Sequence, residues 1–547
     1  MSAFDYVIVG AGSAGCVVAN RLSADPSVSV CLVEAGGRGN SPLVSIPAGV
    51  FGLYGNKKYD YSFASVGQKN LNNRVMNVNR GKALGGSSAI NSMVYMRGSR
   101  NDYDGWAALG CEGWSYDEVL PIFKQMEANT SGQSSDYHGF SGELQVSKQQ
   151  DPNTVAKVFV AAGQAAGLPE NTDFNGASQL GLGIYDVKQN RGQRVSSYTA
   201  FLKPIESRAN LTVMTATQVL CLHIEGDTVT GVEVESSGVK QSLKCHKEVI
   251  LCGGTILSPR ILLTSGIGDR EELQTLGIEC KQHVPGVGEN LQDHIDSMVT
   301  VRSAKPDTIG VSLKTIVPHV LPAPFKYIFA RKGWWTTNYV EAGGFAQTKL
   351  ALEAPKGSPD ADPDVQFHFT PLFRSHRGKD FEWGHGYSVF TCVLRPRSSG
   401  TVKLISDGTK RNVCIDFNFF DHERDQRVLV EGVKKARQIL ASPEFDHLRG
   451  EEMAPGKEVR TDAQILAYLR QTATTVYHPV GTCKMGTDPL AVVNPSTLKV
   501  TGMKNLRVMD ASVMPRLTSG NTSAPSMMIA ERGAAMVLAD KSLQQSR

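Results

Sequence analysis

The stretch Phe4-Asp-Tyr-Val-Ile-Val-Gly-Ala-Gly-Ser-Ala-Gly15 opens the chain and carries its strongest fold signal. Its first six residues read as a short buried strand, and the glycines that follow have the spacing G-x-G-x-x-G. Each glycine has a physical reason: Gly10 permits a tight turn, Gly12 lets the backbone approach a pyrophosphate, and Gly15 lets helix and strand pack closely. The stretch therefore predicts a dinucleotide site.

The residues after this stretch supply the setting that such a site needs. Apolar residues at helical spacing run from Ala14 to Leu22, and a second strand at 28–33 ends on Glu34. The N-terminus of the predicted helix presents unpaired N–H groups to phosphates. An acidic residue about 20 positions after the last glycine accepts hydrogen bonds from ribose hydroxyls. Glu34 thus argues against a ligand with a 2′-phosphate.

Composition narrows the class of protein. A chain of 547 residues predicts about two domains, and 41% apolar with 20% charged residues is ordinary for a globular protein. The 57 basic and 53 acidic residues nearly balance, so we expect no nucleic-acid partner. The ten cysteines and twelve histidines show no metal-ligand spacing, so we expect no metal site. Strand residues begin at position 4 and no long apolar run follows, which favours a cytoplasmic protein with at most peripheral contact to the inner face of the membrane.

Further along the chain, residues 207–252 change to a strand pattern. Apolar runs occur at 211–214, 219–222, 229–232 and 248–252. Gly253 and Gly254 follow the last of them, and Ser258-Pro259 reads as the start of a helix.

The segment 300–465 alternates apolar and polar residues, as in 365–369 and 387–391, and predicts a mostly antiparallel sheet. The predicted fold class is α/β and α+β: a discontinuous Rossmann-type dinucleotide-binding domain with an inserted, mostly antiparallel-sheet substrate domain. We place the dinucleotide domain at 1–150, 191–300 and 466–547, and the substrate domain at 151–190 and 301–465.

Two polar residues near the C-terminal end are candidates for chemistry. His478 precedes Pro479 and a glycine-containing turn, and Asn521 lies in a glycine-adjacent turn just before an apolar helix. Spacing alone leaves a functional and a structural role equally open for this pair. We interpret His294 as a structural hydrogen-bonding residue, and His368 as a residue that lines a cavity or faces the core. Eight other histidines lie in polar contexts and are predicted to be on the surface: His138, His223, His246, His319, His376, His385, His422 and His447.

Several segments together resemble the glucose–methanol–choline (GMC) family of FAD oxidoreductases. Within that family, the chain looks most like the bacterial choline dehydrogenase and aliphatic alcohol dehydrogenase branch. The segments that carry the resemblance occur in the family's order, at residues 10–34, 80–91, 254–268, 477–482 and 510–515.

The resemblance implies FAD as the cofactor. It implies that His478 and Asn521 are the catalytic pair. The residues that it implies around FAD are Gly10, Gly12, Ser13, Ala14, Gly15, Glu34, Ala35, Arg80, Gly81, Gly85, Ser87, Asn91, Met93, Val94, Val219, Gly253, Asp510, Ala511, Asn521 and Thr522. Where choline oxidase carries a histidine bonded to the flavin, this chain has Ile90, so we expect non-covalent FAD.

The expected reaction is oxidation of a primary alcohol to its aldehyde, with electrons passed to a quinone-type acceptor. Alternatives are an oxidase that reduces O₂ to H₂O₂, a flavin-containing lyase, and a binding protein without turnover. Trp334, Trp335 and Glu341 offer groups for a choline cage, although an aliphatic or aryl alcohol suits their apolar neighbours equally well. Residues 315–335 read as a cover of the active site in preference to a membrane contact, because prolines interrupt any amphipathic helix there. A homodimer is one expected assembly.

Overall fold

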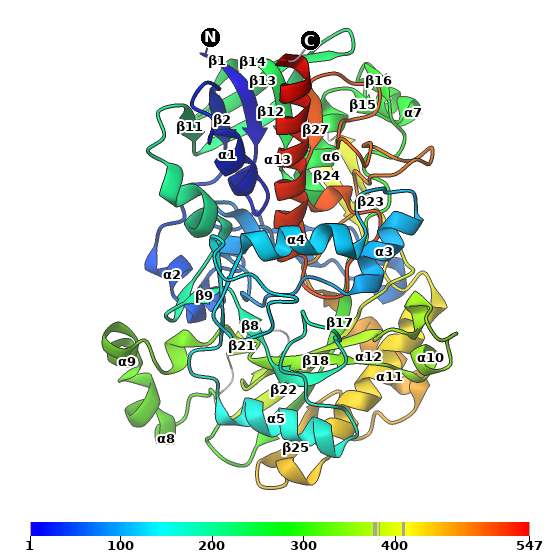
Figure 1. The fold of residues 1–547 in the computed structure, drawn as a ribbon. Helices are drawn as coiled ribbons and strands as arrows, with labels where there is room; N and C mark the ends of the chain where they lie inside the picture. The colour runs from blue at the N-terminus through cyan, green and yellow to red at the C-terminus, as the bar shows by residue number, and fades with distance from the viewer. Residues whose placement is uncertain (1, 376–379, 382, 407–410, 546–547) are drawn as a thin grey trace.

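The computed structural model describes residues 2–545 except 376–379, 382 and 407–410. Its first sheet has seven strands that come from three separate parts of the chain (Figure 1). The strand order is β11 (Leu211–Met214), β2 (Val30–Val33), β1 (Ser2–Val9), β14 (Val239–Leu251), β13 (Thr228–Ser236) and β12 (Thr217–Glu225), with β27 (Leu506–Val508) beside β14. The dinucleotide-type sheet is therefore discontinuous in sequence, as expected.

The parallel strands of this sheet end at one common edge. The register pairs Val9 with Val33 and with Leu251, and Leu251 with Val508. Ligands of open α/β sheets bind outside the carboxyl ends of parallel strands. The glycine-rich stretch leaves β1 at this edge and enters α1 (Gly15–Leu22).

The longest helix, α13 (Ser523–Gln545), connects this sheet to the middle of the molecule. It packs against α1 and α4 (Tyr116–Met126), and its N-terminal end lies in the middle of the molecule, away from the chain's C-terminus (Figure 1). The residues just before α13 therefore lie in the middle of the molecule, between this sheet and the second sheet described below.

The predicted helix start at Ser258-Pro259 is wrong, because α6 runs over Gly254–Thr264 and contains Pro259 in its interior. A proline inside a helix removes the N–H that would reach the carbonyl four residues earlier. Here that carbonyl belongs to Thr255, and it accepts a hydrogen bond from Thr482 Oγ1 at 2.6 Å instead. A partner more than 200 residues away makes the proline tolerable, which no local pattern shows.

The second sheet is antiparallel throughout, in agreement with the alternating pattern. Its order is β18 (Ala342–Ala346), β19 (Val365–Thr370), β22 (Gly386–Val393), β17 (Ile295–Ser303) and β25 (Arg449–Ala454), with β26 (Thr474–Thr475) also on β17. Helices α5 (Thr154–Ala165) and α11 (Glu423–Leu440) pack against it, and α12 (Asp462–Thr472) packs on α11. The domain boundaries stay a prediction.

The remaining helices and strands are short. The helices are α2 (Pro42–Ser45), α3 (Arg100–Ala108), α7 (Arg270–Thr275), α8 (Leu313–Thr315), α9 (Ala323–Ala330) and α10 (Lys349–Leu352). Small sheets pair β3 (Phe63–Ala64) with β4 (Asn77–Val78), β9 (Gln189–Asn190) with β10 (Gln193–Arg194), β15 (Ile267–Gly268) with β16 (Gln282–His283), β20 (Arg374–Ser375) with β21 (Asp380–Phe381), β23 (Thr401–Ser406) with β24 (Arg411–Asp416), and β6 (Leu144–Lys148) with β5 (Glu127–Asn129) and β8 (Asp186–Val187). Among the described residues, none of the helices has the length and apolar character to cross a bilayer.

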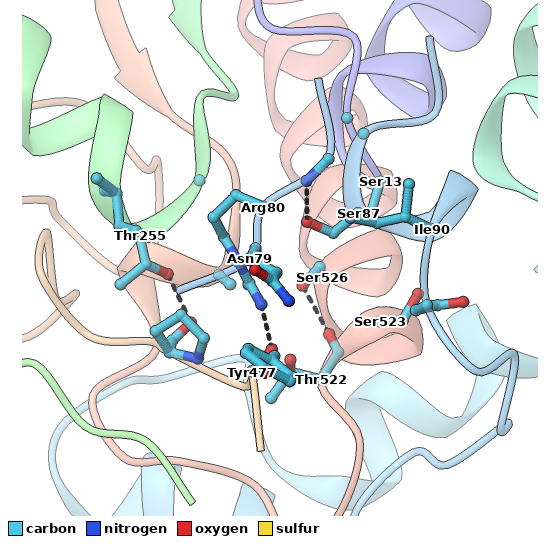
Figure 2. Close-up of a pocket in the computed structure, with 18 of the residues that line it drawn as sticks. Ser13, Asn79, Arg80, Ser87, Ile90, Thr255, Tyr477, Thr522, Ser523 and Ser526 are labelled. Carbon is cyan, nitrogen blue, oxygen red and sulfur yellow. Dashed lines mark hydrogen bonds between the residues drawn. The ribbon is translucent and has the colours of Figure 1, made fainter. Parts of the chain in front are cut away.

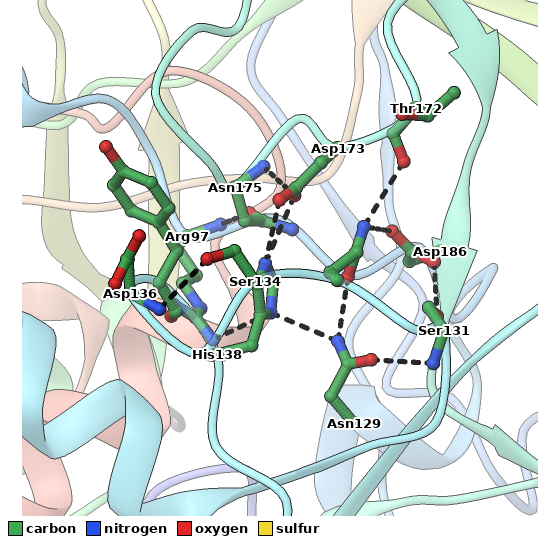
Figure 3. A network of polar contacts seen from close by, with 12 residues as sticks. Arg97, Asn129, Ser131, Ser134, Asp136, His138, Thr172, Asp173, Asn175 and Asp186 are labelled. Atoms are coloured by element: carbon green, nitrogen blue, oxygen red, sulfur yellow. Dashed lines mark hydrogen bonds and ion pairs between the residues drawn. The ribbon is translucent and has the colours of Figure 1, made fainter.

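Two of the predicted surface histidines are buried, and His376 lies outside the described residues. His138 sits between two carboxylates. Its Nδ1 lies 3.0 Å from Glu127 Oε2. Its Nε2 lies 3.0 Å from Asp173 Oδ2, a contact shown in Figure 3. Burial lowers the pKa of His138, but its hydrogen bonds to Asp173 and Glu127 outweigh burial and raise that pKa. His385 is the second, and its Nε2 lies 2.9 Å from Ser312 Oγ. The polar residues next to His138 and His385 in the sequence suggested a surface position for both. That prediction is wrong because hydrogen-bonding partners from other segments allow the two histidines to be buried.

Candidate active site

A cavity of about 320 Å³ lies at the carboxyl edge of the first sheet and extends to the second. Its wall includes Gly10 and Glu34 at one end, and His478 and Asn521 at the other. Most of the residues predicted around a cofactor line it: Gly10, Gly12, Ser13, Ala14, Glu34, Ala35, Arg80, Gly81, Ser87, Asn91, Met93, Val94, Val219, Gly253, Asp510, Ala511, Asn521 and Thr522. The structure thus brings residues from many parts of the chain together around one cavity.

Gly15 and Gly85 are the two predicted residues that do not line the cavity. A Cβ on Gly15 would lie 1.8 Å from the Gly10 carbonyl oxygen, so Gly15 is required for packing between the turn and α1. Gly85 has a φ of +92°, and its N–H donates to the Ala11 carbonyl at 2.7 Å. Both glycines shape the wall from behind.

Two glycine-containing segments meet at the end of the cavity that Gly10 lines. A Cβ on Gly86 would lie 2.6 Å from Gly12 Cα, so the segment containing Gly86 touches the G-x-G-x-x-G turn directly. The N-terminus of α1 faces the same space, and such a terminus favours phosphate. Figure 2 shows Ser13 and Ser87 side by side at this end, where Ser87 Oγ accepts from the Gly81 N–H at 3.1 Å.

Glu34 lies at the same end of the cavity as Gly10 and is buried. Its Oε2 accepts from the Ala11 N–H at 2.9 Å and its Oε1 from the Gly36 N–H at 2.8 Å. Burial raises the pKa of Glu34 to about 7 against those two bonds. Each oxygen has a further lone pair, so the carboxyl can brace the glycine turn and still accept from a ribose hydroxyl.

At the other end, a chain of hydrogen bonds fixes the tautomer of His478. His294 Nε2 lies 3.0 Å from the Leu394 carbonyl oxygen, which only accepts, so this nitrogen of His294 carries the proton. His294 Nδ1 is then an acceptor for His478 Nδ1–H, at 3.0 Å. That leaves the lone pair of His478 on Nε2, where Asn521 Nδ2 donates to it at 3.0 Å. The free-base nitrogen of His478 therefore points toward Asn521, and both residues line the cavity.

Burial keeps both histidines neutral. The pKa of His478 is held well below its ordinary value by burial and by the nearby His294, His368 and Arg80. Burial lowers the pKa of His294 to about 3, against its bond to the Leu394 carbonyl. Neutral imidazoles match the tautomers that the hydrogen bonds require.

Other side chains hold the backbone around this pair. Asp293 Oδ1 accepts from the His478 N–H at 2.9 Å. Arg80 donates to the Tyr477 carbonyl at 2.5 Å, as Figure 2 shows. Asp102 accepts from both the N–H and the Oγ of Ser519, each at 2.8 Å, just before Asn521. The site is preorganised from segments around residues 80, 102, 293 and 478.

Reading the sequence alone missed several residues of the site. His294 is a hydrogen-bonding residue as interpreted, but its partner is the candidate catalytic histidine. Asp296, two positions later at the start of β17, lines the cavity. His368 lines it too, which decides between the two positions, cavity wall or core, that the sequence allowed. The run Asp293-His-Ile-Asp296, polar residues at the start of an apolar strand, was the available signal. Buried Lys188 also escaped notice: its Nζ donates to Ser523 Oγ at 2.5 Å behind the wall, and burial lowers its pKa to about 7.

The suggested choline cage does not line the cavity. Neither Trp334, Trp335 nor Glu341 is among its lining residues, and Glu341 accepts from Thr337 Oγ1 at 2.6 Å and from the Asn153 N–H at 2.7 Å. The aromatic residues that do line it include Phe51, Tyr54, Tyr61, Phe63, Tyr339, Phe390 and Tyr477.

Comparisons with known proteins agree on one family. The family models described as GMC oxidoreductase match residues 4–296 and residues 396–530. Over 538 residues the chain is 42% identical to the alcohol dehydrogenase [acceptor] of Pseudomonas putida, covering 98% of this chain and 96% of the relative. It is 39% identical to the oxygen-dependent choline dehydrogenase of Staphylococcus xylosus, covering 99% and 96%.

Solved structures share the whole fold. Pyridoxine 4-oxidase from Mesorbium loti is 29% identical with a TM-score of 0.86, covering 98% of this chain and 99% of that one. A formate oxidase structure is 26% identical with a TM-score of 0.90, covering 98% of each chain.

Proposed function

The chain belongs to the GMC oxidoreductase family, and from that premise we propose that it oxidises a primary alcohol to the aldehyde, with His478 as the general base. It is an oxidoreductase that acts on CH–OH donors, and its cofactor is FAD. The observation that carries the assignment of His478 is its unprotonated Nε2 beside Asn521, both on the cavity wall.

The residues that line the cavity fit FAD in their chemistry. The glycine turn at 10–15 with the α1 N-terminus suits a pyrophosphate, and Glu34 suits a ribose. Ile90 lines the cavity and has no nucleophilic atom, which supports non-covalent binding. When bound, FAD supplies the acceptor for the hydride that leaves the alcohol α-carbon.

The protein's own contribution is to remove a proton from a weak acid. An alcohol oxygen placed between His478 and Asn521 donates its proton to His478 Nε2 and accepts from Asn521 Nδ2–H. His294 keeps the proton of His478 on Nδ1, so that Nε2 is free to act as the base. The cation that forms on His478 and the Asn521 amide then stabilise the developing alkoxide, as donors set in place before the reaction.

We propose a quinone as the electron acceptor, in line with the 42% identical relative, which is named alcohol dehydrogenase [acceptor]. The 39% identical relative is named an oxygen-dependent choline dehydrogenase, so the test compares a quinone with O₂. The test incubates FAD-loaded protein with 1-octanol, benzyl alcohol or choline and a soluble quinone under argon. We expect one aldehyde and one reduced quinone per alcohol consumed, because the oxidation removes two electrons. In air without quinone we expect little H₂O₂.

Two other outcomes would correct this proposal. Rapid, stoichiometric H₂O₂ in air would replace the quinone with O₂ while leaving alcohol oxidation in place. Absence of aldehyde with every alcohol, with the flavin still oxidised, would contradict alcohol oxidation and favour the lyase alternative.

A further inference from the structure

Six of the 17 large apolar residues that are exposed in the described part of the chain lie in one surface segment. Residues 313–330, here called the apolar arm, comprise α8, the π-helical turn η6 (Ile316–Val320) and α9. The arm lies at the periphery of the molecule, with α8 and α9 beyond the second sheet (Figure 1). Its exposed large apolar residues are Leu313, Val317, Leu321, Phe325, Ile328 and Phe329, and two of them, Leu313 and Phe329, are more than 80% exposed.

The arm is built with its apolar face outward. In α9, Ala323 and Tyr327 are buried, while Phe325, Ile328 and Phe329 face solvent. Tyr327 anchors the helix by donating from its hydroxyl to the Gly192 carbonyl at 3.0 Å. Soluble proteins scatter exposed apolar residues singly, and a contiguous patch marks a binding surface.

The charges around the patch select one kind of partner. Lys314, Lys326, Arg331 and Lys332 lie within or beside the arm, and the sequence has no acidic residue between Asp307 and Glu341. Basic residues beside apolar side chains are the combination that binds anionic lipid surfaces, where the charge attracts and the apolar groups insert.

The arm also leads into the active site. The chain continues from α9 through η7 (Trp334–Thr336) to Tyr339 and Val340, which line the cavity. The ring of Tyr339 meets that of Phe51, another lining residue, edge to face at 5.4 Å. A bilayer bound to the arm would therefore lie on the side of the molecule where the arm connects to Tyr339 and Val340 of the cavity wall.

We propose that the apolar arm docks the enzyme on an anionic bilayer, from which a lipid-soluble quinone reaches the cavity. Docking stands on the arm alone, whereas delivery of the quinone rests on the acceptor proposed above. The prolines at 318, 322 and 324 break the arm into short helical pieces, and each of the six apolar residues named above is still at least 60% exposed.

The test is flotation of the FAD-loaded full chain with vesicles of phosphatidylcholine containing phosphatidylglycerol, compared with phosphatidylcholine alone. We expect binding to the anionic vesicles that weakens with added salt. The double variant Phe325→Asp/Phe329→Asp should bind at least tenfold more weakly, and Lys326→Glu/Lys332→Glu should lose the preference for anionic lipid. Leu352→Asp, a change at a 64% exposed leucine in α10 outside the arm, should bind as the wild type does.

Flavin absorbance and alcohol-dependent reduction of a soluble dye, measured without lipid, show that each variant is folded. They also report on alcohol oxidation separately from docking. Failure of the wild type to float with anionic vesicles would overturn the proposal, as would unchanged flotation of the double phenylalanine variant. A wild-type dimer that becomes monomeric in that variant, without vesicle binding, would show that the arm is a subunit interface instead.

Discussion

At the scale of single residues, the catalytic account depends on where one proton sits. The Leu394 carbonyl forces the proton of His294 onto Nε2, and His294 in turn forces that of His478 onto Nδ1. His478 was predicted from the sequence as a catalytic candidate. The tautomers of His294 and His478 were not, because the hydrogen-bonded groups that fix them lie far apart in the sequence, near residues 294, 394, 478 and 521. Only the fold brings them together.

Removing the acceptor on His294 tests this chain. His294→Phe leaves His478 Nδ1–H without a partner and lets the ring adopt the other tautomer, and an unsatisfied buried donor costs about 1–3 kcal/mol. We expect kcat to fall roughly 5–150-fold with FAD still bound, and His294→Gln, which keeps an acceptor, to recover part of it. A phenylalanine variant within twofold of wild type would contradict the role given to His294.

Asn521 is expected to stabilise the developing alkoxide. Asn521→Ala should lower kcat by about 10²–10³, the usual loss on removing one preorganised donor. Steady-state kinetics with saturating acceptor measure this. A rise in KM alone would show that Asn521 only binds substrate.

The pH dependence follows from the burial of His478. The base is active when unprotonated, and burial with neighbouring charged or titratable groups holds its pKa well below the ordinary value. A lowered pKa moves the loss of the base form to lower pH, so kcat/KM should stay level as pH falls from 8 to 6.5 and decline only below that. A decline centred above pH 6.5 in the pH–rate profile would contradict this environment.

At the scale of elements, the strand–turn–helix–strand at residues 2–34 is where the sequence was most informative. Its glycine spacing, its apolar periodicity and its acidic residue after the second strand all reflect local geometry, so they could be interpreted without the fold. The prediction failed at Pro259 in α6 and at His138, where partners such as Thr482 and Asp173 come from distant segments. Elements set by local sequence were predictable, and those set by long-range hydrogen bonds were not.

A pair of helical glycines tests the packing of this element. Gly15→Ala would place a Cβ 1.8 Å from the Gly10 carbonyl oxygen, whereas Gly105→Ala in α3 meets nothing within 4 Å. We expect the first variant to lose FAD or fail to accumulate as folded protein. The second should retain FAD and gain up to about 1 kcal/mol in the free energy of unfolding, from helix propensity. FAD content and thermal unfolding measure both, and an FAD-loaded Gly15 variant of wild-type stability would refute the packing argument.

At the scale of the whole molecule, two sheets of different topology form different parts of the cavity wall. The parallel strands of the first sheet and the glycine turns beside them form the end of the cavity suited to a dinucleotide. The antiparallel second sheet supplies Asp296, His368 and Phe390 to the cavity wall. The segment that contains His478 and the turn before α13 lie between them. This division explains why the fold class could be predicted from local patterns, whereas the wall of the substrate region could not.

The rate of flavin reduction in a single turnover tests the central claim most directly. FAD-loaded wild type and His478→Ala are mixed without oxygen with the alcohol that gives aldehyde, and the flavin absorbance is followed in time. We predict that the wild type bleaches and that the variant, with equal FAD content, bleaches about 10²–10⁴ times more slowly, which is the usual effect of a positioned acid–base group. Equal rates in the two proteins would contradict the assignment of His478 as the base, and no bleaching of the wild type by any alcohol would contradict alcohol oxidation itself.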